Sequence, residues 1–170
     1  MAANDPVVQI IREIPPAASS AAIISRAGGS TPAENVVGHA FDAASDEYMD
    51  FLCRLHGYDG GGLTLVLAWT PDTATSGNCD WEASIRAIPD DAEDLDGSHT
   101  YVANGVIAAS PNAAGEVGYD SITFTDGADM DSLADGELFI LRIMRDANDA
   151  TNDTMTGDAQ LWDVLGYETA

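Results

Sequence analysis

Apolar and polar residues alternate in short runs over most of this chain, and turns separate the runs. In residues 63–70, Leu63, Leu65, Leu67 and Trp69 alternate with smaller or polar side chains. A period of two residues is that of a β-strand with one face buried. Residues 79–86 repeat the pattern, and glycine, proline and aspartate fill the segments between such runs. We therefore predict an all-β fold.

The predicted strands number about eight, each bounded by turn residues. They cover residues 37–43, 46–55, 63–70, 79–86, 101–108, 119–125, 138–145 and 155–167. Eight antiparallel strands of this length favour a two-sheet β-sandwich of jelly-roll type. The most apolar run, 138–145, is expected at the centre of a sheet. A helix over residues 43–55, with acidic residues in its first turn, is the alternative there.

Residues 1–34 differ from the rest, because proline and glycine pairs interrupt their short apolar pieces. We predict an extended N-terminal arm (residues 1–34) leading into a sandwich domain (residues 35–170). The arm carries three acids and two arginines, so nearly all of the net charge of −23 lies on the domain. A nearly neutral arm with apolar patches is typical of a docking segment; a disordered or partly packed terminus is the alternative. Its candidate partner-binding residues are Val7, Val8, Ile10, Ile11, Ile14, Ile23 and Ile24.

The charge balance excludes some partners. The chain has 29 acidic and six basic residues, all of the bases being arginine. Nucleic-acid binding depends on cations that neutralise phosphates, and anionic membranes also attract basic segments. We therefore expect neither nucleic acid nor a membrane as partner. The N-terminus lacks a basic and apolar leader, so we expect no signal peptide.

The sequence offers no recognisable catalytic signature. The three histidines lie in no known motif, and the serine-hydrolase, zinc-protease and phosphate-loop patterns are absent. We predict that the protein is not an enzyme and holds no cofactor. Calcium is the one ion considered, because residues 90–96 and 146–153 gather oxygen ligands. Neither loop has the twelve-residue pattern of an EF-hand, and solvated acidic loops are the alternative.

Two further residue types bear on ligands and redox state. Trp69 and Trp81 are in phase with the apolar faces of their strands, which predicts core positions. Trp162 is out of phase with its apolar neighbours and is the candidate ligand contact. Cys53 and Cys79 lie in different predicted strands; a reduced buried pair and a single disulfide both remain open.

Several segments together resemble a jelly-roll module frequent in structural proteins of tailed bacteriophages. The segments are 41–51, 58–69, 73–81, 136–139 with 142–147, and 153–161. The glycine turn at residues 60–62 leading to Trp69, and the Arg145-Asp146-Ala147 step, are the most distinctive. The resemblance spans about residues 40–167. It departs at Cys79-Asp80, where members usually have valine.

This resemblance implies a virion structural protein without catalytic residues. The expected function is capsid decoration: the protein would dock on the major capsid protein or neighbouring virion proteins at the capsid exterior, after assembly in the host cytoplasm. A homo-oligomer, with a trimer favoured, would suit that location. The alternatives are a tail, fibre or baseplate module and a carbohydrate-binding β-sandwich.

Overall fold

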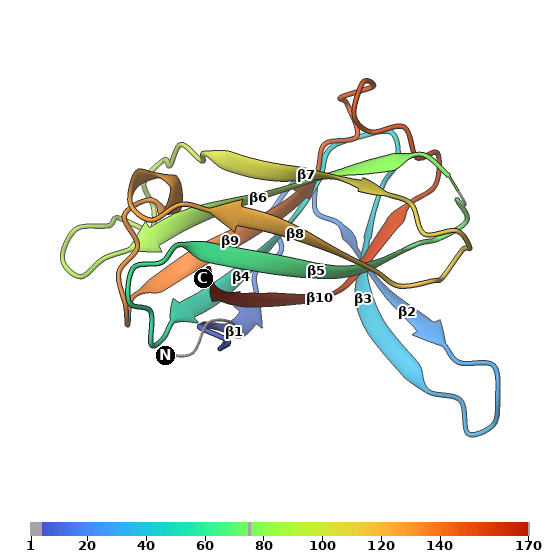
Figure 1. Cartoon of the computed structure of the whole chain (residues 1–170), viewed down its shortest axis with the longest axis horizontal. Coiled ribbons are helices and arrows are strands. Elements are labelled where there is room, and N and C mark those ends of the chain that lie inside the picture. Colours follow the sequence, from blue (N-terminus) through green and yellow to red (C-terminus); the bar gives the residue numbers. More distant parts are fainter. Residues whose placement is uncertain (1–4, 75, 170) are drawn as a thin grey trace.

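Ten strands form two five-stranded antiparallel sheets that pack face to face (Figure 1). The computed structural model describes residues 5–74 and 76–169, so the first four residues of the predicted arm lie outside the described residues. The strands are β1 (Val8–Glu13), β2 (Ala22–Ala27), β3 (Asn35–Phe41), β4 (Glu47–Leu55), β5 (Leu63–Pro71), β6 (Asn78–Ile88), β7 (Ala103–Ala109), β8 (Gly118–Phe124), β9 (Leu138–Arg145) and β10 (Ala159–Glu168). A short 3₁₀ helix, η1, covers Ala128–Met130.

The strand order confirms the predicted fold class. One sheet has the order β1-β4-β9-β6-β7 and the other β2-β3-β10-β5-β8. Without the two leading edge strands, β3 to β10 form two four-stranded sheets in jelly-roll order. The most apolar strand, β9, lies at the centre of its sheet as predicted. Residues 47–55 form a strand, not the alternative helix. No described helix is long and apolar enough to span a membrane.

The N-terminal segment accounts for the two strands beyond the predicted eight. β1 pairs with β4 at the edge of one sheet, and β2 pairs with β3 at the edge of the other. The predicted arm is therefore extended but hydrogen-bonded to the sandwich on both sides. Edge strands bury little of their surface, so β1 and β2 lack the regular alternation that marks a strand in sequence.

The core lies between the sheets, where alternate residues of the strands face inward. Trp69 and Trp81 are fully buried and meet edge to face, with ring centroids 5.9 Å apart. This confirms their predicted core positions. Both cysteines are buried and free, and burial raises the pKa of the Cys53 thiol to about 12. Both thiols are therefore in the reduced form in this structure.

A fully buried arginine anchors the loop that joins β9 to β10. Arg145, the last residue of β9, donates two hydrogen bonds of 2.8 Å to the carboxylate of Asp153. It also donates to the backbone carbonyls of Phe41, Met155 and Gly157. The guanidinium thereby ties the loop to the end of β3.

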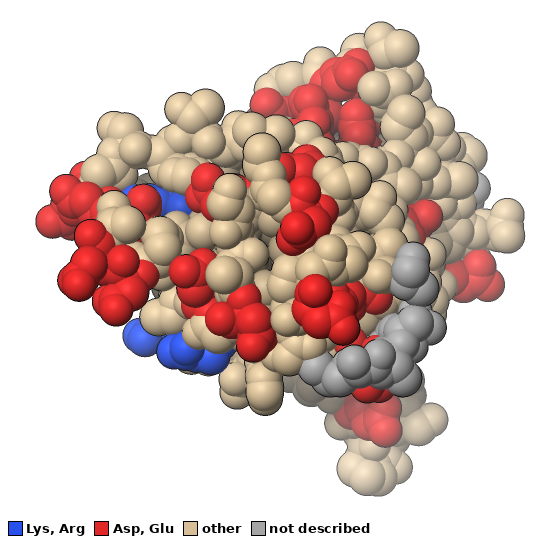
Figure 2. Space-filling model, turned by 60° about the vertical axis from the view of Figure 1, so that its left-hand side comes forward, with Lys and Arg blue, Asp and Glu red and all other residues tan. Residues whose placement is uncertain are grey.

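Carboxylates cover the outside of the sandwich. Figure 2 shows them scattered over the visible face, with arginines at one end of the view only. Three of the arginines are paired with carboxylates in the described ranges, namely Arg86 with Glu93, Arg142 with Asp50 and Arg145 with Asp153. Most of the acidic surface is therefore uncompensated.

The β2–β3 hairpin projects from the body of the sandwich (Figure 1). The cause is a short pairing: β3 bonds to β10 only through the last three residues of β3, from His39 to Phe41. The earlier residues of β3 bond to β2 alone. The hairpin therefore leaves the sheet at Gly38 and forms one wall of the groove described next.

Candidate functional site

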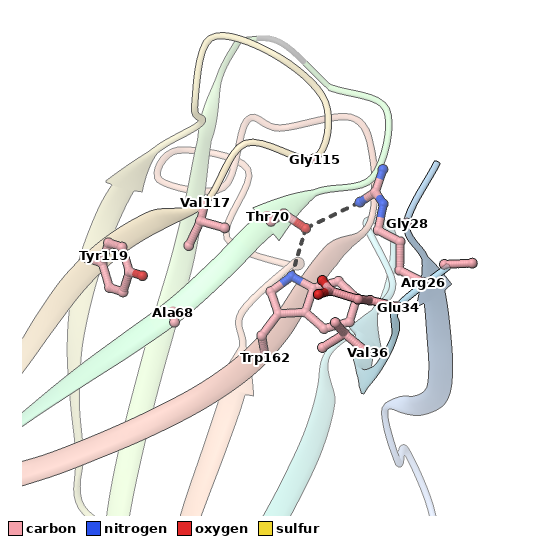
Figure 3. A pocket seen from close by; sticks show the side chains of 11 residues that line it. Arg26, Gly28, Glu34, Val36, Ala68, Thr70, Gly115, Val117, Tyr119 and Trp162 are labelled. Atoms are coloured by element: carbon pink, nitrogen blue, oxygen red, sulfur yellow. Dashed lines mark hydrogen bonds between the residues drawn. The ribbon is translucent and has the colours of Figure 1, made fainter. Parts of the chain in front are cut away.

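A groove of about 400 Å³ runs over the outer face of the β2-β3-β10-β5-β8 sheet. Figure 3 shows it between the projecting hairpin and the segment that leads into β8. Its lining comes from five strands and two loops. The lining residues are Arg26, Ala27, Gly28, Glu34, Val36, Ala68, Thr70, Gly115, Val117, Tyr119 and Trp162.

A β-bulge places Trp162 in this groove. The register of β10 against β5 shifts between Leu161 and Asp163, so Trp162 is an extra residue in its strand. Leu161 stays in the core, and the indole lies instead against Gly38 of β3. A Cβ at Gly38 would stand only 2.6 Å from an indole carbon, so this close approach requires glycine. Trp162 Nε1 donates to Thr70 Oγ1 at 2.9 Å, which fixes the ring (Figure 3).

A polar network forms one end of the groove. Arg26 Nη1 donates to Gln160 Oε1 at 2.7 Å, and Gln160 Nε2 donates to Asp72 Oδ1 at 3.0 Å. The guanidinium also approaches Thr70 Oγ1 at 3.5 Å and packs against Gly115. In the described part of the chain, Arg26 takes part in none of the arginine–carboxylate ion pairs. Its charge is held in place by neutral groups and faces the groove.

The opposite wall is aromatic and apolar. Tyr119 is 71% exposed and stands beside Ala68, its partner across the β5–β8 ladder. Val117 on the same wall is about half exposed, and so is Val36 on the hairpin wall. The groove therefore has a narrow floor at Ala68, aromatic rings on two strands, and hydrogen-bonding groups at one end (Figure 3). Such a surface suits a ligand with both apolar faces and hydroxyl groups.

Of the sequence candidates, Trp162 lies in the groove, whereas none of the seven arm candidates lines it. Val7 is a core residue at 2% exposure, so it presents no surface to a partner, and Val8 packs against the core. Ile10 and Ile11 are exposed on β1, whereas Ile23 is exposed on β2 of the other sheet. The remaining two, Ile14 and Ile24, are partly buried. The structure thus divides the predicted docking residues between two sheet edges.

Sequence reasoning missed most of the groove. Arg26, Thr70, Val117 and Tyr119 come from segments that look ordinary one at a time. The out-of-phase position of Trp162 was the only signal of the site in the sequence.

One of the two acidic loops belongs to a carboxylate cluster. Asp146 and Asp149 offer oxygens within 4.8 Å of one another and of Asp80, a β6 residue that the loop pattern did not indicate. Burial, and then the neighbouring carboxylates, raise the pKa values of Asp80 and Asp146. In the other loop the Asp94 carboxylate accepts from the backbone N–H of Asp96.

Comparisons with known proteins show distant likenesses only. No protein-family model matches the chain, and no curated protein matches it. Among solved structures, the carbohydrate-binding module TmCBM61, in complex with β-1,4-galactotriose, is 10% identical with a TM-score of 0.40; the match covers 92% of this chain and 87% of that one. The enzymatically active domain of tailspike protein 4 from bacteriophage CBA120 is 11% identical with a TM-score of 0.38, covering 85% and 17%.

A third solved structure is the CBM22-1 xylan-binding domain of Xyn10C from Paenibacillus barcinonensis. It is 9% identical with a TM-score of 0.36, and the match covers 91% of this chain and 99% of that one. Identities and TM-scores this low do not carry a function across to the present chain.

Proposed function

We propose that the protein is a non-catalytic carbohydrate-binding module and that the groove on the β2-β3-β10-β5-β8 sheet is its binding site. The single observation that supports this most is the pairing of Trp162 and Tyr119 around a small floor residue. Sugar rings have apolar C–H faces that pack on aromatic side chains, and hydroxyls that need donors and acceptors. The groove supplies both.

The fixed geometry of the groove favours binding. Trp162 is locked by its hydrogen bond to Thr70 and by the close approach to Gly38. Arg26 is held by Gln160. Side chains that are already ordered lose little conformational entropy when a ligand arrives. The site is therefore pre-formed.

The net charge of the protein limits which kinds of carbohydrate the groove is expected to bind. A net charge of −23 repels polyanions, and Glu34 lies in the groove itself. Arg26 and Glu34 together offer a donor and an acceptor for neighbouring hydroxyls. The proposed ligand is a neutral oligosaccharide.

A glycan array followed by calorimetric titration tests this function. We expect Tyr119→Ala and Trp162→Ala each to weaken binding of the selected neutral glycan by about 10-fold, equivalent to about 1.4 kcal/mol. Ile107→Ala, an exposed apolar change on the other sheet, is the matched control and should leave the affinity unchanged. An array without a neutral glycan hit, or equal affinities for all three variants, contradicts the proposal.

Virion docking, as a capsid decoration protein or a tail-associated module, is the second candidate function. The projecting hairpin favours it, because Ile23, Val36 and Val37 are 51–63% exposed there. Exposed apolar side chains on an extended hairpin offer contacts to a larger assembly. The partner would be a major capsid protein or another virion protein.

Co-sedimentation with purified capsids and tails separates the two functions. Docking predicts that Ile23→Asp and Val37→Asp abolish co-sedimentation and leave glycan affinity intact. Light scattering of the free protein tests the expected trimer. If the intact chain sediments with neither particle, docking is refuted.

A further inference from the structure

The strand β2 is a sheet edge whose outer side is open. Within the described residues it pairs with β3 alone, residues 22–27 against residues 35–40. The pairing runs without a register shift, so no bulge distorts the edge. An open edge presents a row of backbone N–H and C=O groups that can pair with another strand.

The other three sheet edges are protected in the described ranges. β7 and β8 lie against each other and close one side of the sandwich, where Asn104 Nδ2 donates to the Thr123 carbonyl at 2.8 Å. β1 carries a bulge between Ile10 and Arg12. Covered edges and bulges are devices by which proteins prevent unwanted strand pairing.

The β2 edge lacks these devices. It contains no proline and no acidic residue, and its one charged side chain, Arg26, is bonded to Gln160 over the groove. Ile23 is 63% exposed on this strand. Because the hairpin projects from the sandwich (Figure 1), a second chain can reach the edge without meeting the body of the protein.

The charge distribution favours a second copy of this chain as the partner. Residues 20–40 contain one arginine and one glutamate, so the hairpin is neutral although the whole chain carries −23. Two such acidic chains repel each other least where a neutral, projecting segment keeps their bodies apart, because salt screens charges beyond about 8 Å at physiological ionic strength. A basic partner would be drawn to the acidic body instead of the neutral hairpin.

We propose that β2 of one copy pairs antiparallel with β2 of a second copy across a two-fold axis. The two β2-β3-β10-β5-β8 sheets then form one continuous ten-stranded sheet. Both copies use the same residues, so the interface closes at two copies. It therefore gives a dimer, not the trimer expected for virion docking.

In this dimer the two grooves open on the same side. The two-fold axis that relates antiparallel edge strands stands perpendicular to the sheet, so both outer faces stay on one side. Two sites on one side can bind a surface that displays many copies of a glycan with an avidity above that of one site. This consequence rests on the proposed function, whereas the dimer does not.

Sedimentation equilibrium of the full chain over a concentration series tests the dimer. We expect a monomer–dimer equilibrium whose Kd falls as NaCl rises from about 50 to 500 mM, because salt screens the repulsion between the acidic bodies. Ile23→Lys should raise the Kd at least about 10-fold, since a lysine on an edge strand disfavours pairing. Val37→Lys is the matched control: Val37 is 59% exposed on the same hairpin, but it lies on β3, away from the edge, and the Kd should not change.

Cysteine cross-linking locates the contact. Ser25 is exposed near the middle of β2, and the native Cys53 and Cys79 are buried and do not compete for the reagent. With a short bis-maleimide, Ser25→Cys should give a covalent dimer. Ser121→Cys, exposed on β8 of the same sheet, should not.

Several results overturn the proposal. They are a monomer at all concentrations, a trimer, a dimer that Ile23→Lys leaves intact, or equal cross-linking at the two cysteine positions. A Kd that rises with salt also overturns it, because the contact is then ionic. Co-sedimentation of a strictly monomeric protein with capsids or tails would assign the hairpin to a virion partner instead. A glycan array without a hit contradicts only the proposed function and leaves the dimer standing.

Discussion

Replacing Arg145 with methionine removes the charge that Asp153 needs in the protein interior. Asp153 is 7% exposed and receives both of its charged hydrogen bonds from the guanidinium of Arg145. A methionine side chain fills much of the same space, but it donates no hydrogen bonds. The substitution leaves a buried carboxylate without its counter-ion and removes the hydrogen bonds that Arg145 donates to three backbone carbonyls.

The expected loss is large because the pair is fully desolvated. Breaking a buried ion pair by removing one partner lowers the free energy of unfolding by about 3–5 kcal/mol. For a chain of this length, 1 kcal/mol shifts Tm by about 2–4 °C, so Arg145→Met should lower Tm by about 6–20 °C. Urea unfolding should show a lower midpoint with an unchanged m-value.

Arg142 provides the matched control. It makes the same bidentate contact to Asp50, but its side chain is 26% exposed and also stacks on Tyr48 and Tyr101. A partly solvated pair is weaker, so Arg142→Met should lower the free energy of unfolding by only about 1–2 kcal/mol.

A double variant that removes both charges tests whether the unpaired buried charge causes the loss of stability. The double variant Arg145→Met with Asp153→Leu should recover part of the loss, because no charge is then left unpaired. Equal losses for Arg145→Met and Arg142→Met, or no recovery in the double variant, refute the reasoning that the unpaired buried charge dominates.

Three further predictions concern the Asp80–Asp146 cluster, the Cys79 thiol and the contact between Gly38 and Trp162. Burial raises the pKa values of Asp80 and Asp146 above the usual 3.8, so the folded state binds more protons between 3.8 and the raised values; Tm should therefore rise as pH falls from neutral towards 3.8, and Asp146→Asn should flatten that scan. A Tm that falls over this range contradicts it. Burial also raises the pKa of the Cys79 thiol, so iodoacetamide should label it only on unfolding, and rapid labelling of the native protein is the contrary result. Gly38→Ala should lower the free energy of unfolding by about 1–3 kcal/mol and weaken glycan binding, since the new Cβ meets the Trp162 ring; unchanged Trp162 fluorescence speaks against this contact.

The alternation of apolar and polar residues was enough to predict the strands and the tryptophans that face the core. The alternation through Leu63, Leu65, Leu67 and Trp69 predicts both the strand and the face that is buried, because a strand has a period of two wherever it lies. Turn residues mark where each strand ends. These signals suffice for the eight strands of the jelly roll.

The alternation of apolar and polar residues does not predict the edge strands β1 and β2. It also does not predict which face of the sheet each residue of β10 takes. β1 and β2 expose most of their side chains, so no burial pattern marks them. The bulge at Trp162 shifts the alternation by one residue part-way along its strand. A pattern that assumes strict alternation assigns the residues on one side of a bulge to the wrong face.

The amino-acid sequence by itself determined the fold class, the acidic surface and the absence of a recognisable catalytic signature. Only the tertiary structure decided which residues meet: Arg26 with Gln160 in the groove, Asp80 with Asp146, and Glu13 of β1 with His39 of β3. Periodicity reports which face of a strand is buried. It carries no information on which distant strand lies alongside, because pairing is set by the packing of the whole sandwich.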